Sequence, residues 1–165
     1  MERAIDVAQY VFERYRVLSG GEVIDEMKLH KLLYLIQRES LAITGEPLIA
    51  EPFYGWKYGP VSKPVRQAYT REGMEEDDIQ MISNESAYIA NNVIALYGGY
   101  ESWKLSEMSH REISWKNARH GVSPDKKGDR QLSLEDIKKD AEKVRPYDTL
   151  YDMYYDEFED AEDLA

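Results

Sequence analysis

The stretch DEMKLHKLLYLIQRESLAI, residues 25–43, decides the fold of this chain. Its apolar residues recur at the three- and four-residue spacings of a helix. One face carries Leu29, Leu32, Leu33 and Ile36, and the adjoining face carries His30, Tyr34, Gln37 and Leu41. A helix that is apolar around most of its circumference is usually buried, so we predict that this helix forms the centre of the domain.

The remaining edge of this helix is polar and carries Lys28, Lys31 and Arg38. A lysine normally lays its apolar stem along the protein surface and keeps its ammonium group in water. We therefore expect Lys28 and Lys31 on a solvated edge, with contact to a carboxylate of a partner as the alternative. On a solvated edge, alanine at either position leaves stability almost unchanged.

Periodicity and capping residues predict further helices on both sides of the central one. These helices span residues 3–17, 62–72, 83–97, 102–108 and 133–144, with Ser62, Ser83, Ser102 and Ser133 as N-caps. Residues 48–61 are aromatic and interrupted by glycine and proline, which favours extended chain and turns. Residues 117–131 lack periodicity and collect basic side chains, so we expect a mobile basic loop there.

The expected fold is therefore mainly α, with one compact domain over residues 1–146. It has about six to seven helices, a short aromatic extended or β segment, and an acidic amphipathic C-terminal tail over residues 147–165. The chain of 165 residues is 42% apolar, enough for one hydrophobic core. The absence of cysteine excludes disulfides, a cysteine nucleophile and thiolate-bound metal.

Negative charge is concentrated at the C-terminal end of the chain. The net charge is −11, and residues 148–165 contain eight carboxylates and no lysine or arginine. Tyr151, Tyr154 and Phe158 recur among these acids at helical spacing. The tail is thus expected either to dock on its own domain or to bind a partner with a basic surface. No apolar run approaches a membrane span and no signal peptide is evident, so we expect a cytoplasmic protein without a membrane partner.

The chemistry-bearing residues give little support to an enzyme. No nucleophile elbow, phosphate-binding loop or dinucleotide motif occurs. The histidines lack the spacing of a metal site, so we expect no metal and no cofactor. His30 is expected in the core, hydrogen-bonded to a backbone or tyrosine group, and His110 at a polar helix end. An enzyme that uses His110 with a nearby carboxylate is kept as an alternative.

Aromatic residues are more informative, because tyrosine and tryptophan are favoured at protein interfaces. Phe53, Tyr54, Trp56 and Tyr58 surround a glycine-proline turn. They are expected to pack on the central helix or to form a binding loop. Gly59 and Pro60 are expected to fix the turn, and Trp56 and Trp115 to clamp it to the core.

Three ordered motifs resemble the Panacea domain, the family of SocA-like antitoxins and phage-associated GepA-like proteins. They are Met27–Gln37 (MKLHKLLYLIQ), Trp56–Val61 (WKYGPV) and Leu105–His110 (LSEMSH) with Trp115. Ser109 stands where the family commonly has threonine, and Ser114 where it has proline. The resemblance covers residues 3–145 and leaves the acidic tail outside.

The resemblance implies an antitoxin that neutralises a toxin protein encoded nearby through direct contact. In some family members the antitoxin is also a proteolytic adaptor that delivers the toxin to an AAA+ protease. No catalytic residue is implied. The expected partner-binding residues are Trp56, Tyr58, Gly59, Pro60, His110, Tyr151, Tyr154 and Phe158. The alternative is a phage- or operon-associated transcriptional regulator that binds DNA through Lys28, Lys31 and Arg38 or through the basic loop.

Overall fold

A computed structural model describes residues 1–144, and this part of the chain is mainly helical, as predicted. Its seven helices are α1 (Ala4–Leu18), α2 (Glu26–Thr44), α3 (Lys63–Ala68), α4 (Asn84–Tyr97), α5 (Ser102–Ser109), α6 (Ile113–Ala118) and α7 (Leu134–Ala141). Its two antiparallel hairpins are formed by β1 (Tyr54–Trp56) with β2 (Gly59–Val61), and by β3 (Tyr69–Thr70) with β4 (Gly73–Met74). The predicted tail, with Tyr151, Tyr154 and Phe158, lies outside the described residues.

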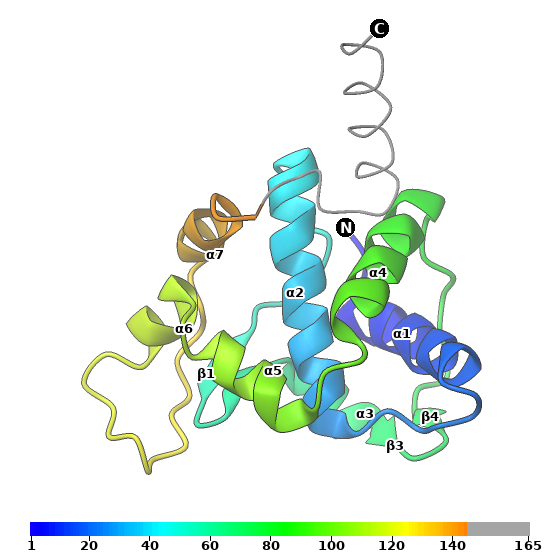
Figure 1. The fold of residues 1–165 in the computed structure, drawn as a ribbon, viewed down its shortest axis with the longest axis horizontal. Coiled ribbons are helices and arrows are strands. Elements are labelled where there is room, and N and C mark those ends of the chain that lie inside the picture. Colours follow the sequence, from blue (N-terminus) through cyan, green and yellow to red (C-terminus); the bar gives the residue numbers. More distant parts are fainter. Residues whose placement is uncertain (145–165) are drawn as a thin grey trace, which may run out of the picture.

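Helix α2 is central, which confirms the prediction from its sequence. In Figure 1 it runs through the middle of the molecule, with α1 and α4 on one side and α6 and α7 on the other. Leu29, Leu33 and Ile36 are fully buried, and the helix begins where Asp25 accepts a hydrogen bond from the Lys28 backbone at 2.8 Å. It ends at Gly45, which has a left-handed backbone (φ 78°).

The prediction that Lys28 and Lys31 lie on a solvated edge of α2 is wrong, because other elements cover both lysines. Lys28 is 8% exposed, and its amino group donates to the carbonyl of Gly98 at 3.0 Å and to the Tyr15 hydroxyl at 3.2 Å. Lys31 is 2% exposed and donates to the carbonyl of Pro60 at 3.0 Å. The covering segments are distant in sequence, so the periodicity of one helix could not indicate them.

The hairpin of β1 and β2 confirms the predicted aromatic extended segment. Tyr54 pairs with Val61 and Trp56 with Gly59. Phe53, just before it, is buried and meets the ring of Tyr34 edge to face at a centroid distance of 6.0 Å. The hairpin is thereby attached to the middle of α2.

Other boundaries differ from the sequence prediction. The helix after Ser62 ends at Ala68, because the chain then turns into the β3–β4 hairpin. Glu101, and not Ser102, is the N-cap of α5, because Ser102 already has its place in the first turn of the helix. The Ser102 hydroxyl donates to Asp25 at 2.6 Å. Helix α6 was not predicted; its six residues are too few for a periodic pattern.

The loop of residues 117–131 is tied to the core through Arg119, which corrects the prediction of a mobile basic loop. The Arg119 side chain is buried and donates to four backbone carbonyls at 2.6–3.1 Å. They belong to Gly55, Ser123, Lys126 and Lys127. One guanidinium thus joins the hairpin to the loop.

A buried polar network joins α2 to α6 and α7. The Tyr34 hydroxyl lies 3.0 Å from both Ser114 Oγ and Asp140 Oδ2. The Asp140 carboxylate also accepts hydrogen bonds from the backbone N–H groups of Ile113 and Ser114, at 2.7 and 3.0 Å. Asp140 therefore caps the start of α6 from another helix, as a local N-cap side chain otherwise does.

Candidate interaction site

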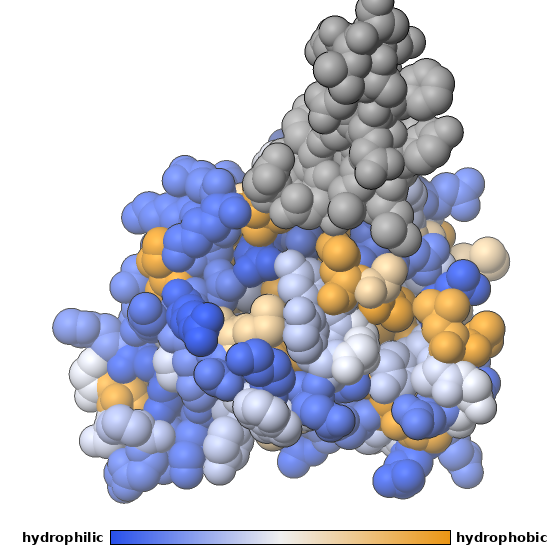
Figure 2. Space-filling view, in the orientation of Figure 1, coloured by the Kyte–Doolittle hydropathy of each residue, from blue (hydrophilic) through white to orange (hydrophobic). Residues whose placement is uncertain are grey.

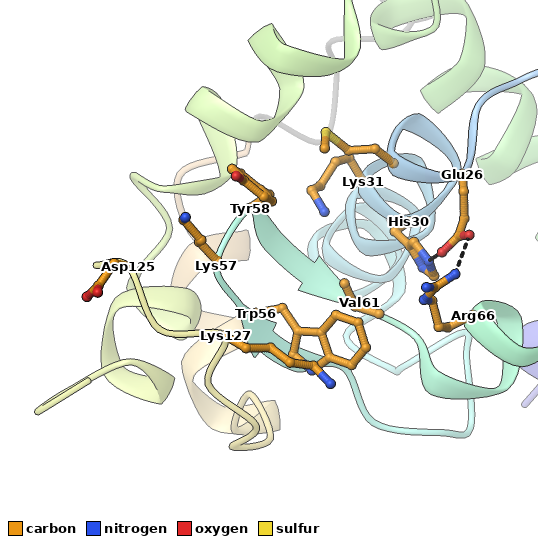
Figure 3. A pocket seen from close by; sticks show the side chains of 11 residues that line it. Glu26, His30, Lys31, Trp56, Lys57, Tyr58, Val61, Arg66, Asp125 and Lys127 are labelled. Atoms are coloured by element: carbon orange, nitrogen blue, oxygen red, sulfur yellow. Dashed lines mark hydrogen bonds and ion pairs between the residues drawn. The ribbon is translucent and has the colours of Figure 1, made fainter. Parts of the chain in front are cut away.

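A pocket of about 540 Å³ lies between α2, the β1–β2 hairpin, α3 and the loop before α7. Figure 3 shows its walls, with Trp56, Tyr58 and Val61 from the hairpin side and the base of α2 opposite. Lys57 and Lys127 lie at its outer part, and Lys31 is on its inner wall. Of the predicted partner-binding residues, Trp56 and Tyr58 are brought together here.

The Lys31 ammonium group is the most unusual charge in this pocket. Its nitrogen donates to the carbonyl of Pro60, and within residues 1–144 it forms no ion pair. Burial lowers the pKa of Lys31 to about 7, although the carboxylates of Glu26 and Asp25 act in the opposite direction. A lysine that changes charge near neutral pH therefore forms part of the pocket.

A second polar group of the pocket consists of Glu26, His30 and Arg66. The Glu26 carboxylate lies 3.0 Å from His30 Nε2 and accepts a hydrogen bond from Arg66 at 2.8 Å, as drawn in Figure 3. Burial opposes ionisation of Glu26, but the hydrogen bond from His30, and then Arg66, lower the pKa of its carboxyl. The Glu26 carboxylate is therefore already hydrogen-bonded within the protein, to His30 and Arg66.

His30 is buried and bound to the backbone, as predicted. Its Nδ1 accepts from the backbone N–H of Ser62 at 3.3 Å, which leaves the proton on Nε2 for Glu26. Burial lowers the pKa of His30, against the hydrogen bond to Glu26. The neutral imidazole thus joins α2 to the start of α3.

The turn of the hairpin is held by contacts on both sides. Gly59 has φ 122°, and a Cβ at this position would meet Ser109 Oγ and Lys31 Cε. The Ser106 hydroxyl donates to the carbonyl of Tyr58 at 2.6 Å, and the Trp115 indole donates to the carbonyl of Trp56 at 2.8 Å. Trp115 therefore holds this turn. Gly59 allows the close approach of the turn to Ser109 and Lys31, and Pro60 provides the carbonyl that accepts from Lys31.

The two aromatic residues of the turn remain accessible. Tyr58 is 55% exposed, with the Lys57 amino group 5.3 Å from its ring centre. Trp56 is half-buried, with the Lys127 amino group 4.0 Å from its ring centre and its indole nitrogen 3.2 Å from Asp129. Cations thus stand against the faces of both rings.

His110 has a packing role next to this turn. Its ring stacks on Trp115 with centroids 4.1 Å apart and an angle of 11° between the planes. Burial lowers the pKa of His110, against a hydrogen bond with the Lys57 backbone, and Lys31 and Arg119 lower it further. These neighbours are not acids, so the geometry gives no support to an acid–base pair that uses His110.

Two other expectations concern DNA and metals. Lys28 and Lys31 are buried, and Arg38 forms an ion pair with Glu112 at 2.5 Å. The basic stripe that the regulator alternative needs is therefore not available on α2.

Within residues 1–144 no group of three or more histidines and acids is arranged to hold a metal. In the same residues no helix is long and apolar enough to cross a membrane.

The sequence prediction did not include Lys57 and Lys127 in a binding site, and it gave contact of Lys31 with a partner's carboxylate only as the alternative to a solvated edge. Lys57 lies inside the WKYGPV motif, so the motif itself could have indicated it. Glu26 and His30 are four residues apart on one helix, a spacing typical of a side-chain pair. No local signal distinguishes Lys31 from a surface lysine.

A separate apolar surface lies over α1 and α4. Figure 2 shows apolar side chains gathered there, on the side of the molecule away from α6 and its loop. Val17 and Leu18 at the end of α1 are 67% and 56% exposed.

The chain belongs to the SocA-like antitoxin family with a Panacea domain. The family model described as "Antitoxin SocA-like, Panacea domain" matches residues 29–116, from α2 to α6, and includes the β1–β2 hairpin. No curated protein and no solved structure matches the chain. Membership suggests an antitoxin role, which is non-catalytic, and implies a toxin as partner.

Proposed function

We propose that this chain neutralises a toxin protein by direct binding, and that the partner contacts the β1–β2 turn and the adjacent pocket. The observation that carries the proposal is Tyr58, a tyrosine 55% exposed on a turn that Ser106 and Gly59 hold in place. The family supplies the kind of partner. The turn supplies an aromatic contact beside a cavity.

A rigid aromatic turn suits this role for energetic reasons. Large aromatic side chains dominate the binding energy of many protein interfaces. Binding also costs free energy when mobile side chains and loops become ordered. Because Trp115 and Ser106 already hold the backbone of the turn, less of that cost falls on complex formation.

The acidic residues 147–165 have a separate role in this proposal. They lie outside the described residues, so the support comes from their eight carboxylates. Charge complementarity with a basic toxin raises the rate of association, whereas buried aromatic contacts slow dissociation. Tyr151, Tyr154 and Phe158 remain predicted contacts of this segment.

The test of the turn is co-expression with the neighbouring gene, if its product arrests growth. Tyr58→Ala is expected to abolish or strongly reduce rescue, because it removes the exposed aromatic contact. The matched control is Tyr88→Ala on α4. It removes a tyrosine that is 47% exposed and does not line the pocket. Full rescue by Tyr58→Ala, with normal protein levels, contradicts a role for the turn.

Deletion of residues 147–165 tests the acidic segment. We expect slower association with the toxin and incomplete rescue, with a loss that grows as salt is lowered because the charge attraction is then less screened in the full chain. Association rates measured with purified proteins at two salt concentrations provide the readout. Full rescue by the truncated chain removes the segment from the mechanism.

The proteolytic-adaptor form of the proposal adds delivery of the bound toxin to an AAA+ protease. It predicts that the toxin's half-life in cells shortens when the antitoxin is present. Equal half-lives with and without the antitoxin, together with full neutralisation, leave steric inhibition as the mechanism.

A further inference from the structure

The inner wall of the pocket carries a cation whose hydrogen-bonding capacity is mostly unused. An ammonium group has three N–H donors, and Lys31 uses one of them on the carbonyl of Pro60. Burial of a cation without a counter-charge is costly, so interior cations are generally paired. In the described part of the chain Lys31 is 2% exposed and has no ion pair, whereas Arg38, two turns along the same helix, is paired with Glu112.

The rest of the pocket has the properties of a site for an apolar anion. Trp56, Tyr58 and Val61 provide apolar walls. Two further cations, Lys57 and Lys127, line the pocket, and a third, Arg66, is ion-paired with Glu26. Of the two acids, Glu26 is hydrogen-bonded to His30 and Arg66. The pocket lining in the described residues thus holds four lysine and arginine side chains and two acids.

We propose that this pocket binds an apolar or aromatic group that ends in a carboxylate, with the carboxylate on Lys31 and the apolar part against Trp56 and Val61. In Figure 3 the Lys31 amino group is directed toward the side of the pocket where Val61 and Trp56 lie. The pocket volume of about 540 Å³ is in the range of small-molecule sites. The carboxylate comes from a free acid or from a residue of the bound toxin; only the second source rests on the proposed function.

The proposed contact of a carboxylate with Lys31 also affects the protonation of the Lys31 amine. The lowered pKa of Lys31 means that a fraction of the chains carries a neutral amine near pH 7. A carboxylate beside the amine favours the ammonium form, so binding is coupled to proton uptake. The charged and titratable groups around Lys31 in the described chain are Asp25, Glu26, His30, Tyr34, Arg38, Lys57, Tyr58, Arg66, His110, Glu112, Asp125 and Lys127.

The test uses two probes of nearly equal shape, 3-phenylpropionate and 3-phenylpropionamide. Binding is followed from the indole N–H signal of Trp56 in NMR titrations of the full chain at pH 6.5. We expect a dissociation constant in the range of about 1 mM for the acid. A charge-assisted hydrogen bond makes the acid bind about tenfold more tightly than the amide.

The variant Lys31→Met removes the charge and keeps the length of the side chain. It is expected to bind the acid and the amide equally. The matched control is Lys28→Met, which removes the other buried lysine of α2, outside this pocket, and keeps the preference for the acid. Equal binding of acid and amide by the wild-type chain, or binding of neither, overturns the proposal.

A measurement on the wild-type chain keeps the test decisive if Lys31→Met does not fold. Between pH 6 and pH 9 the affinity for the acid should fall several-fold as Lys31 loses its proton, and the affinity for the amide should stay constant. An acid affinity that does not change over this range contradicts the assigned contact.

Competition then identifies the source of the carboxylate. If the toxin supplies it, saturating 3-phenylpropionate weakens toxin binding, and Lys31→Met weakens it as well. If a free acid is the natural ligand, the toxin binds equally with and without the probe, and the acid–amide preference persists. Failure of neutralisation in cells therefore leaves the ligand preference measurable on its own.

Discussion

Helix α2 carries the largely buried cations Arg38 and Lys31, and of these two only Arg38 is paired with an acid in the described chain. In its C-terminal half Arg38 is paired with Glu112, and at its middle Tyr34 bonds to Ser114 and Asp140. Toward its N-terminal half, Lys31 has one neutral acceptor and borders an open pocket. Paired polar groups fix helices to each other, whereas an unpaired cation leaves binding capacity for a ligand.

The pKa shifts reflect this difference. At the paired end burial raises the pKa of Glu112, although the neighbouring Arg38 opposes the rise. Burial also raises the pKa of the Tyr34 hydroxyl, and Glu112 and Asp140 add to the effect, so Tyr34 keeps its proton and remains a donor. At the pocket end burial lowers the pKa of Lys31 into the neutral range.

The largest effect is expected when the paired end is broken by Asp140→Ala. Asp140 is fully buried and accepts from the backbone of Ile113 and Ser114 and from Tyr34. Its loss leaves the two backbone N–H donors unsatisfied, at a cost of about 3–5 kcal/mol in the free energy of unfolding. Urea denaturation measures it. Glu135→Ala, one turn away with an exposed side chain, should change stability by less than about 0.5 kcal/mol.

A smaller loss is expected from Gly59→Ala at the pocket end. The methyl group would collide with Ser109 Oγ and Lys31 Cε, and the backbone angle of 122° disfavours alanine. Strain and overpacking together should cost about 2–3 kcal/mol. Gly45→Ala is the control for the backbone term, because it has φ 78° and nothing within 4 Å, and it should cost about 1 kcal/mol. Equal losses at both positions would show that the collision at the turn does not occur.

The smallest effect on stability is expected from Lys31→Met. In contrast to Asp140→Ala, this substitution is not expected to lower the free energy of unfolding at pH 6. The pKa of Lys31 is about 7 in the folded chain and near 10.5 when the chain is unfolded. Between these values the unfolded chain binds more protons, so this group makes stability rise with pH. Below pH 7 the burial penalty is fully present, and it diminishes as pH increases to 10.5.

Lys31→Met should therefore leave stability unchanged or raise it at pH 6, and flatten the rise above pH 7. Thermal denaturation from pH 6 to pH 10 measures this, with Lys28→Met as control. The other groups that face Lys31, from α2, α3, the hairpin, α5 and the loop before α7, remain in both variants. A marked destabilisation of Lys31→Met at pH 6 would mean that the lysine supports the fold and not a ligand.

Part of the site could be predicted from the sequence and part could not. The aromatic turn was identified correctly because Trp56, Tyr58 and the Gly59–Pro60 pair lie together in one short segment. Lys31 was expected in solvent, because helical periodicity places it on the polar edge of an isolated helix. The hairpin that covers it comes nearly thirty residues later. His110 was chosen from a motif, but it packs on Trp115.

The sequence by itself determined the central helix, the family and the aromatic turn, because spacing and turn chemistry act between neighbours in the chain. Only the tertiary structure decided which charges are buried and which of them are paired. Desolvation depends on every segment that covers a group, and the folded chain brings a carboxylate against Arg38 but only a backbone carbonyl against Lys31.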